Sequence, residues 1–235
     1  MSLTLAIVSS GQVLAGTITG CTRLIDSRSP AVKQKRDFSD VLVWLTSSEE
    51  PRPLTLRKRV EMVQKDKRFS PHILAIETGT SVDFPNLDPI FHNAFSNYDG
   101  KIFDVALYPP GSSRTVRFDR PGVVRVFCNI HPSMSAIVVV VNSDHFAVTD
   151  QNGQYALAHV SPGEYQLHFF HERATPETLA KLTRTIVVGD NVEPLTMSMT
   201  TISEAGYLPV AHKNKYGLDY PAKSDRADAY LLQMK

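Results

Sequence analysis

Cysteine is scarce in this chain of 235 residues, which contains only Cys21 and Cys128. Two cysteines allow one disulfide bridge at most, so a disulfide-rich fold is excluded. An excess of charge of either sign is also lacking, because 25 basic and 24 acidic side chains leave a formal net charge of +1. A near-neutral chain has no broad basic field, and nucleic acid is therefore not an expected partner.

Long apolar runs are lacking as well. No segment reaches the roughly 20 apolar residues of a transmembrane helix. The first residues, MSLTLAIVSSGQVLAG, are mildly apolar but have no basic region before them, so they match a signal peptide poorly. ITGC, which ends at Cys21, matches a lipoprotein cleavage box only in part. The sequence therefore predicts no membrane span and leaves open whether Cys21 is lipidated or is a small residue at a strand end.

Short β-type runs, separated by turn residues, fill most of the chain instead. About eight such runs lie between KRVEMVQ and AIVVVV, with turn sequences such as NLDP, NYDG and PPGSS between them. This regular punctuation is typical of a β-sandwich or a Greek-key barrel. The clearest helix start is Thr175-Pro176-Glu177, with Thr175 as N-cap. The predicted fold class is all-β.

Four segments are predicted along the chain. Residues 53–143 form one β-sandwich and residues 144–202 a second, smaller one, in which QNG and SPG mark two hairpin turns. Residues 1–52 contain strand-like runs that are predicted to pair with 144–202, so that the first sandwich is inserted into the second. Residues 203–235 predict an extended tail that lies on the body or on a partner. The basic run RLIDSRSPAVKQKRD predicts a solvated loop.

The stretch CNIHPSM carries the chemistry, because it places Cys128, His131 and Met134 within seven residues. Thiolate, imidazole and thioether donors together select a soft or borderline metal, and two histidines with one Cys and a weak axial Met form the blue-copper set. One His is missing from this loop and must come from another strand. His92 is favoured over His72, because it follows the turn NLDP and precedes Asn93, whose side chain can hydrogen-bond to the loop of Cys128.

These residues also have other interpretations. Cys128 alone is equally well explained as a buried small apolar residue, and a Cys21–Cys128 disulfide would exclude a ligating thiolate. A Cys–His hydrolase is disfavoured because no third orienting group is visible. His168 and His171 suggest a second metal site with Glu172, but strand residues three apart face opposite sides, which favours one surface and one core histidine.

Residues 70–141 resemble a cupredoxin on these motifs. The spacing C-x-x-H-x-x-M, with Pro132 after the His, is similar to that of the amicyanin branch. The segments FSPHILAIETGTSVDFPNLDPIFHNAFS and VFCNIHPSM resemble bacterial proteins described as methylamine-utilisation or plastocyanin-like, and TDQNGQYALAHVSPGEYQL resembles the carboxypeptidase regulatory-like β-sandwich. The sequence departs from the cupredoxin pattern at Phe91 and Ile130, where proline is usual.

The resemblance implies a Greek-key cupredoxin sandwich with one type 1 copper site that cycles between Cu²⁺ and Cu⁺. His92, Cys128 and His131 would be the strong ligands and Met134 the long axial one. His131 would also be the exposed edge through which electrons pass, and Pro132 would donate no hydrogen bond toward the thiolate because it has no N–H.

The function expected from this resemblance is single-electron transfer outside the cytoplasm, in the periplasm or an equivalent compartment. No bond chemistry is expected, so the chain is predicted not to be an enzyme. The partners would be a redox protein donor and acceptor, such as a c-type cytochrome or a membrane oxidoreductase. The alternative is a cell-surface β-sandwich that serves as a binding scaffold or stores copper without redox shuttling.

Overall fold

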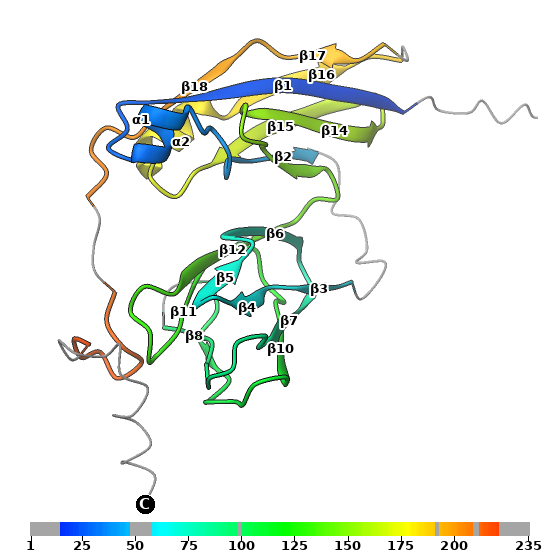
Figure 1. Ribbon diagram of the computed structural model, residues 1–235. Coiled ribbons are helices and arrows are strands. Elements are labelled where there is room, and N and C mark those ends of the chain that lie inside the picture. Colours follow the sequence, from blue (N-terminus) through cyan, green and yellow to red (C-terminus); the bar gives the residue numbers. More distant parts are fainter. Residues whose placement is uncertain (1–14, 48–57, 98–99, 191–192, 209–211, 221–235) are drawn as a thin grey trace, which may run out of the picture.

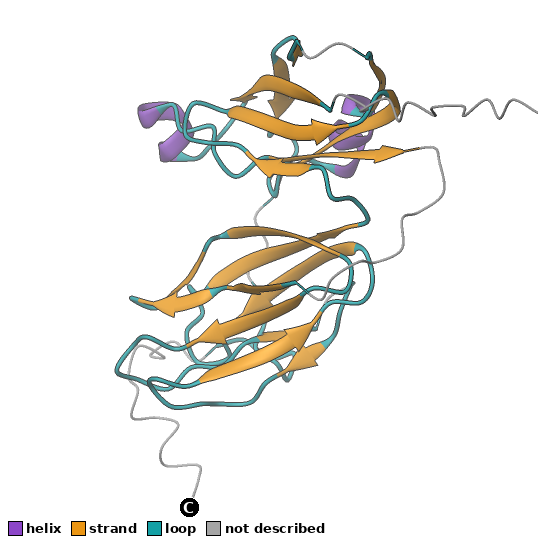
Figure 2. Cartoon of the chain, turned by 90° about the vertical axis from the view of Figure 1, so that its right-hand side faces the viewer, coloured by secondary structure: helices purple, strands orange, loops and turns teal. Residues whose placement is uncertain are grey.

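The computed structural model describes residues 15–47, 58–97, 100–190, 193–208 and 212–220. The fold is all-β: these ranges contain 18 strands and two short helices (Figures 1 and 2). Neither helix found in these ranges is long and apolar enough to cross a bilayer. Parts of the predicted N-terminal segment and tail, at 1–14, 48–57 and 221–235, lie outside the described residues.

One sandwich, here called the central sandwich, is built from strands β3 to β12. Its larger sheet has the order β6-β12-β11-β8-β9, with β6 parallel to β12, and its smaller sheet has the order β10-β7-β3, with β3 parallel to β7. Strands β4 and β5 form a separate hairpin. The strands are β3 (Arg59–Glu61), β4 (Val63–Lys65), β5 (Arg68–Ser70), β6 (Ile73–Glu77), β7 (Ser81–Pro85), β8 (Phe95–Ser96), β9 (Phe103–Asp104), β10 (Ser113–Arg117), β11 (Gly122–Phe127) and β12 (Ser135–Val141).

The other sandwich, here called the composite sandwich, combines strands from before and after the central one. In one of its sheets β1 pairs with β14, β17 and β18, and its other sheet has the order β13-β2-β15-β16. Figure 1 shows the blue β1 lying beside the green and orange strands. The elements are β1 (Gly16–Ile25), α1 (Pro30–Lys35), β2 (Leu42–Ser47), β13 (Phe146–Val148), β14 (Gln154–Val160), β15 (Gly163–Phe170), α2 (Pro176–Leu182), β16 (Arg184–Val188), β17 (Leu195–Thr196) and β18 (Thr200–Ser203).

Strand β12 explains why the chain contains an uninterrupted run of valines. Successive side chains of a strand point to opposite faces, and both faces of β12 are covered. Ala136, Val138 and Val140 belong to the core of the central sandwich. Ile137 and Val139 belong to a separate apolar cluster with Leu42 of β2, on the side that meets the composite sandwich. The two sandwiches therefore share a buried apolar interface along β12.

An ion pair also joins the two sandwiches. His72 Nε2, just before β6, lies 2.9 Å from Glu172 Oε2, just after β15. Burial alone would raise the pKa of Glu172, but the hydrogen bond and charge of His72 outweigh it and hold that pKa at about 2. The same hydrogen bond raises the pKa of His72. His72 therefore forms an ion pair at the interface between the sandwiches and does not serve the site of Cys128.

The helices bear out one expectation and correct another. Helix α2 begins as predicted, with the Thr175 side chain accepting a hydrogen bond from the Thr178 N–H and Pro176 in the first turn. The basic run that was predicted to be a solvated loop instead contains the end of β1 and helix α1. Pro30 starts this helix, and Val32, its one buried residue, packs in the core of the composite sandwich.

We expect Gly153 to be essential for the turn before β14. Its φ of +79° suits glycine, and a Cβ added there would overlap the carbonyl oxygen of Thr22 in β1. Gly206 is a matched control, because its φ is +83° but its added Cβ would meet Thr175 at an ordinary 3.4 Å. In denaturant unfolding, Gly206→Ala should lower the free energy of unfolding by about 1 kcal/mol and Gly153→Ala by about 3 kcal/mol. Equal losses would show that the close approach of Gly153 to β1 is unimportant.

Candidate metal centre

His92 is placed by a short β-bridge at one end of the central sandwich. Its backbone N–H donates to the Tyr108 carbonyl at 3.3 Å, and its carbonyl accepts from the Tyr108 N–H at 2.9 Å. The side chain is fully buried. Because both the N–H and the carbonyl of His92 are bound to Tyr108, the backbone that carries the imidazole is fixed just before β8.

Cys128, His131 and Met134 lie on the loop that connects β11 to β12. Cys128 directly follows β11, and β12 starts directly after Met134. The loop is closed by two backbone hydrogen bonds, from Cys128 N–H to the Met134 carbonyl at 3.2 Å and from Met134 N–H to the His131 carbonyl at 3.0 Å. These bonds fold CNIHPSM into a tight turn with the Cys, His and Met side chains buried.

The three strongest candidate donors converge. His92, Cys128 and His131 each offer one ligand atom, and these atoms all lie within 4.8 Å of one another. Cys128 Sγ is 3.9 Å from His92 Nδ1 and 3.6 Å from His131 Nδ1. Met134 is fully buried and belongs to the same apolar cluster as Cys128. Two imidazoles and a thiol at such distances suit a soft or borderline metal ion.

Asn93 ties the strand of His92 to the loop of Cys128, as its position in the sequence suggested. Its side-chain oxygen accepts a hydrogen bond from the Asn129 N–H at 2.6 Å, and its amide group donates to Asp104 at 3.1 Å. Asn93 is buried, so this bond is shielded from water. The separation between the two ligand-bearing segments is therefore fixed by a direct contact.

Asp88 orients His92, and sequence reasoning missed it. Asp88 Oδ2 accepts a hydrogen bond from His92 Nε2 at 2.8 Å, which leaves the lone pair on Nδ1, the atom that faces Cys128. The carboxylate is held by the backbone N–H groups of Asp66 and Lys67, in the turn between β4 and β5. The only hint in the sequence was the acidic residue of NLDP, four positions before His92.

The electrostatics of the site follow from its burial. Burial lowers the pKa of His92, although the hydrogen bond that His92 donates to Asp88 opposes this shift, and a neutral imidazole is the form that ligates a metal. Burial also raises the pKa of the Cys128 thiol. Hydrogen bonds from the backbone N–H groups of Asn93, Ile130 and His131 lower this pKa, but burial has the larger effect. A buried thiol becomes a thiolate most readily when a cation compensates the charge, as a bound metal ion would.

The expected exposed edge of His131 is wrong. Its exposed fraction is 5%, although the neighbouring Pro132 is exposed. The His131 ring packs against the His92 ring, with centroids 4.7 Å apart. Residues of the segment 212–220 also bind the loop from outside, with His212 Nε2 2.8 Å from the Pro132 carbonyl. The predicted tail lies on the body of the protein at this point.

The other candidate residues lie elsewhere. His72 pairs with Glu172 and is not part of the His92 cluster. Cys21 and Cys128 are both free, so the disulfide alternative is excluded. His171, which directly follows β15, is fully buried, whereas His168 within β15 stacks on Trp44 and is half-buried, so one is a core and the other a surface histidine as expected.

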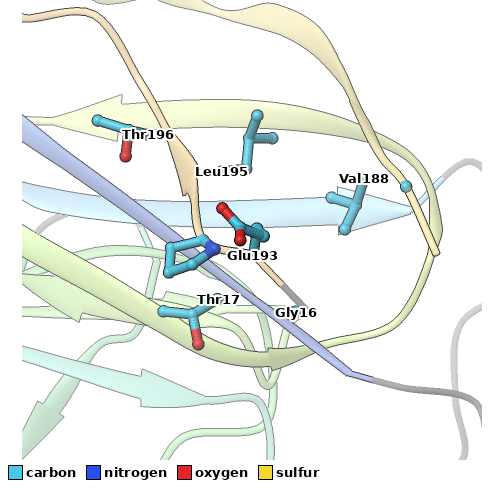
Figure 3. Close-up of a pocket in the computed structure, with 8 residues that line it drawn as sticks. Gly16, Thr17, Val188, Glu193, Leu195 and Thr196 are labelled. Atoms are coloured by element: carbon cyan, nitrogen blue, oxygen red, sulfur yellow. The ribbon is translucent and has the colours of Figure 1, made fainter. Parts of the chain in front are cut away.

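A pocket of about 130 Å³ lies apart from this site, in the composite sandwich (Figure 3). It is lined by Gly16, Thr17, Val188, Gly189, Glu193, Pro194, Leu195 and Thr196. Glu193 is the only charged residue in this lining, which contains neither His nor Cys. The pocket therefore offers no donor set comparable to that around Cys128.

Solved structures similar to this chain include several copper proteins. A purple cupredoxin from Nitrosopumilus maritimus has 26% identity and a TM-score of 0.32, over 35% of this chain and 99% of its own. Amicyanin from Paracoccus versutus has 18% identity and a TM-score of 0.34, over 41% and 97%. A copper-containing nitrite reductase from Thermus scotoductus has 24% identity and a TM-score of 0.33, over 51% and 28%.

No protein-family model matches the sequence, and neither does any curated protein. Because the TM-scores of these three structures lie between 0.32 and 0.34, the similarities alone establish neither the function nor a family for this chain. The chemistry of the site rests on the residues that converge on Cys128.

We expect Asp88→Asn to weaken Cu²⁺ binding by about 10- to 100-fold, because carboxylates that orient a ligating histidine contribute this much to affinity. Affinity can be measured by competition with a chromophoric chelator. Asp119→Asn is the control, since Asp119 pairs with Arg117 on the surface and is 54% exposed. Equal affinities of the Asp88 variant and the control would show that Asp88 does not orient a ligand.

Proposed function

We propose that this chain is a type 1 copper protein that transfers single electrons. The observation that carries the proposal is the buried cluster of His92, Cys128 and His131, whose donor atoms lie within 4.8 Å of one another. The fit to copper is chemical, because two imidazoles, one thiolate and a thioether from Met134 are the donors of a blue-copper centre. One such site is proposed, in the central sandwich.

Each residue has a distinct part in this proposal. His92, Cys128 and His131 would hold the metal strongly, and Met134 would be the weak axial ligand. Bound copper would supply the couple Cu²⁺/Cu⁺ and hence a one-electron change. Asn93 and the two hydrogen bonds that close the loop would keep the donor atoms in place in either oxidation state of a bound copper ion. A site that moves little on reduction is suited to electron transfer.

The wider setting is part of the same proposal. The central sandwich is taken as a cupredoxin domain, and the composite sandwich as a carboxypeptidase regulatory-like domain into which it is inserted. The composite sandwich is joined to the central one through the interface along β12. We propose that the chain works outside the cytoplasm, exchanges electrons with redox proteins and catalyses no bond chemistry of its own.

The ligand choice can be tested with two matched histidines. His92→Ala should abolish the intense visible band of the copper-loaded protein, because it removes one strong ligand. His72→Ala should keep that band, because His72 is paired with Glu172 at the interface between the sandwiches. Optical spectra of the two variants after addition of Cu²⁺ measure this. Loss of the band in His72→Ala with retention in His92→Ala would refute the assignment.

The axial ligand can be tested through the reduction potential. Met134→Gln supplies an oxygen donor, which favours Cu²⁺, so the potential should fall. Met134→Leu removes the donor and makes the site more apolar, so the potential should rise. Each shift should be on the order of 100 mV, with 59 mV equal to a factor of ten for one electron. The visible band should remain in both variants, and voltammetry that finds both potentials unchanged would show that Met134 does not face the metal.

A further inference from the structure

The segment 212–220 holds the outside of the ligand loop at three polar positions. Tyr220 Oη donates to the Cys128 carbonyl at 2.9 Å, and His212 Nε2 lies 2.8 Å from the Pro132 carbonyl. The backbone N–H of Lys215 donates to Asn129 Oδ1 at 3.0 Å. In Figure 1 this orange segment comes down beside the green loop that follows β11. Successive groups of the loop are thus bound by one stretch of chain.

Aromatic rings close the same contact. The His212 ring stacks on the Phe127 ring, with centroids 4.0 Å apart and an interplanar angle of 22°. Tyr220 packs edge-on against His212 at 5.2 Å. Phe127 precedes Cys128 and is 5% exposed. The rings therefore shield the end of β11 just where the strand enters the loop.

Asn129 connects this outer contact to the inner one. Its N–H is bound by Asn93 from inside the sandwich, and its side-chain oxygen is bound by Lys215 from the segment outside. Lys215 Nζ also lies 2.7 Å from Asp104, which accepts the hydrogen bond of Asn93. A single network of polar contacts runs from the segment to the residue that follows His92.

The segment has a built shape of its own. Asn214, which is 7% exposed, accepts hydrogen bonds from the N–H groups of Tyr216 and Leu218. The outward side chains contrast with this, since Tyr216 is 71% and Leu218 is 63% exposed. The segment therefore binds the loop with its inner face and exposes its outer face to solvent, so it covers the loop.

We infer that residues 212–220 form a cap that closes the Cys128 loop against solvent and small molecules. The segment follows β18 in the chain, so the tail that leaves the composite sandwich supplies a wall of the site. The cap deepens the proposed function, because a partner that approaches this end would meet His212, Tyr216 and Tyr220 instead of His131. Its shielding effect does not itself require copper.

The test uses the full chain without metal, in a Cys21→Ser background, so that Cys128 is the only thiol. The rate of alkylation of Cys128 by iodoacetamide reports how often the loop opens. His212→Ala combined with Tyr220→Ala removes two polar contacts and both rings, and should raise the rate roughly tenfold or more. Tyr220→Phe removes only the hydroxyl and should raise it a few-fold. Tyr216→Phe is the matched control and should leave it unchanged.

Unfolding midpoints of the variants separate the cap from general stability. A rate in the double variant equal to that of the parent would overturn the proposal, and so would an increase fully explained by a lower midpoint. If the double variant does not fold, the alkylation rates of Tyr220→Phe and Tyr216→Phe are compared instead, and equal rates would overturn the proposal. Faster alkylation in a protein that fails to bind Cu²⁺ would leave the cap standing and refute the proposed function, so the two failures are distinguishable.

Discussion

Asn93 accepts the Asn129 N–H at 2.6 Å and so ties the segment of His92 to the loop of Cys128. These two segments are 36 residues apart in the sequence, and the antiparallel pairing of β8 with β11, at Phe95 and Phe127, also brings them together. The bridge to Tyr108 and the closed turn of the loop support each segment separately. The β8–β11 pairing ends at Phe127, and the Asn93 bond continues the connection one step further, to Asn129 beside Cys128. With it, a metal ion would find its donors already assembled, and little conformational entropy would be lost on binding.

The same site is supported from two further directions. Asp88 is held by the turn between β4 and β5 and fixes the His92 ring, so even a small hairpin at the margin of the sandwich has a part in the site. The segment 212–220 binds the loop from outside and originates beyond β18. The composite sandwich, joined to the central one along β12, therefore carries the chain back to the site. This gives a physical reason for an inserted architecture: one sandwich holds the candidate ligands, and the tail that follows the other sandwich covers them.

The sequence predicted the parts of the site that are encoded locally. Cys128, His131 and Met134 lie within one turn, and Asn93 follows His92 directly, so their spacing alone was enough to predict which residues lie together. Asp88 could have been found only with the knowledge that the β4–β5 turn would hold its carboxylate. His212 and Tyr220 contact residues 80 and 92 positions away, and no local pattern encodes such contacts. The same limit explains why His131 was expected to be exposed and why helix α1, whose one buried anchor is Val32, was predicted to be a loop.

The central claim is that the cluster around Cys128 is a type 1 copper site. Anaerobic titration of the metal-free protein with Cu²⁺, followed by optical and paramagnetic resonance spectra, tests it most directly. The account predicts saturation at one copper per chain, with an intense thiolate-to-copper visible band that disappears on reduction and returns on oxidation. A protein that stays colourless after binding Cu²⁺, or that binds none while correctly folded, would contradict it.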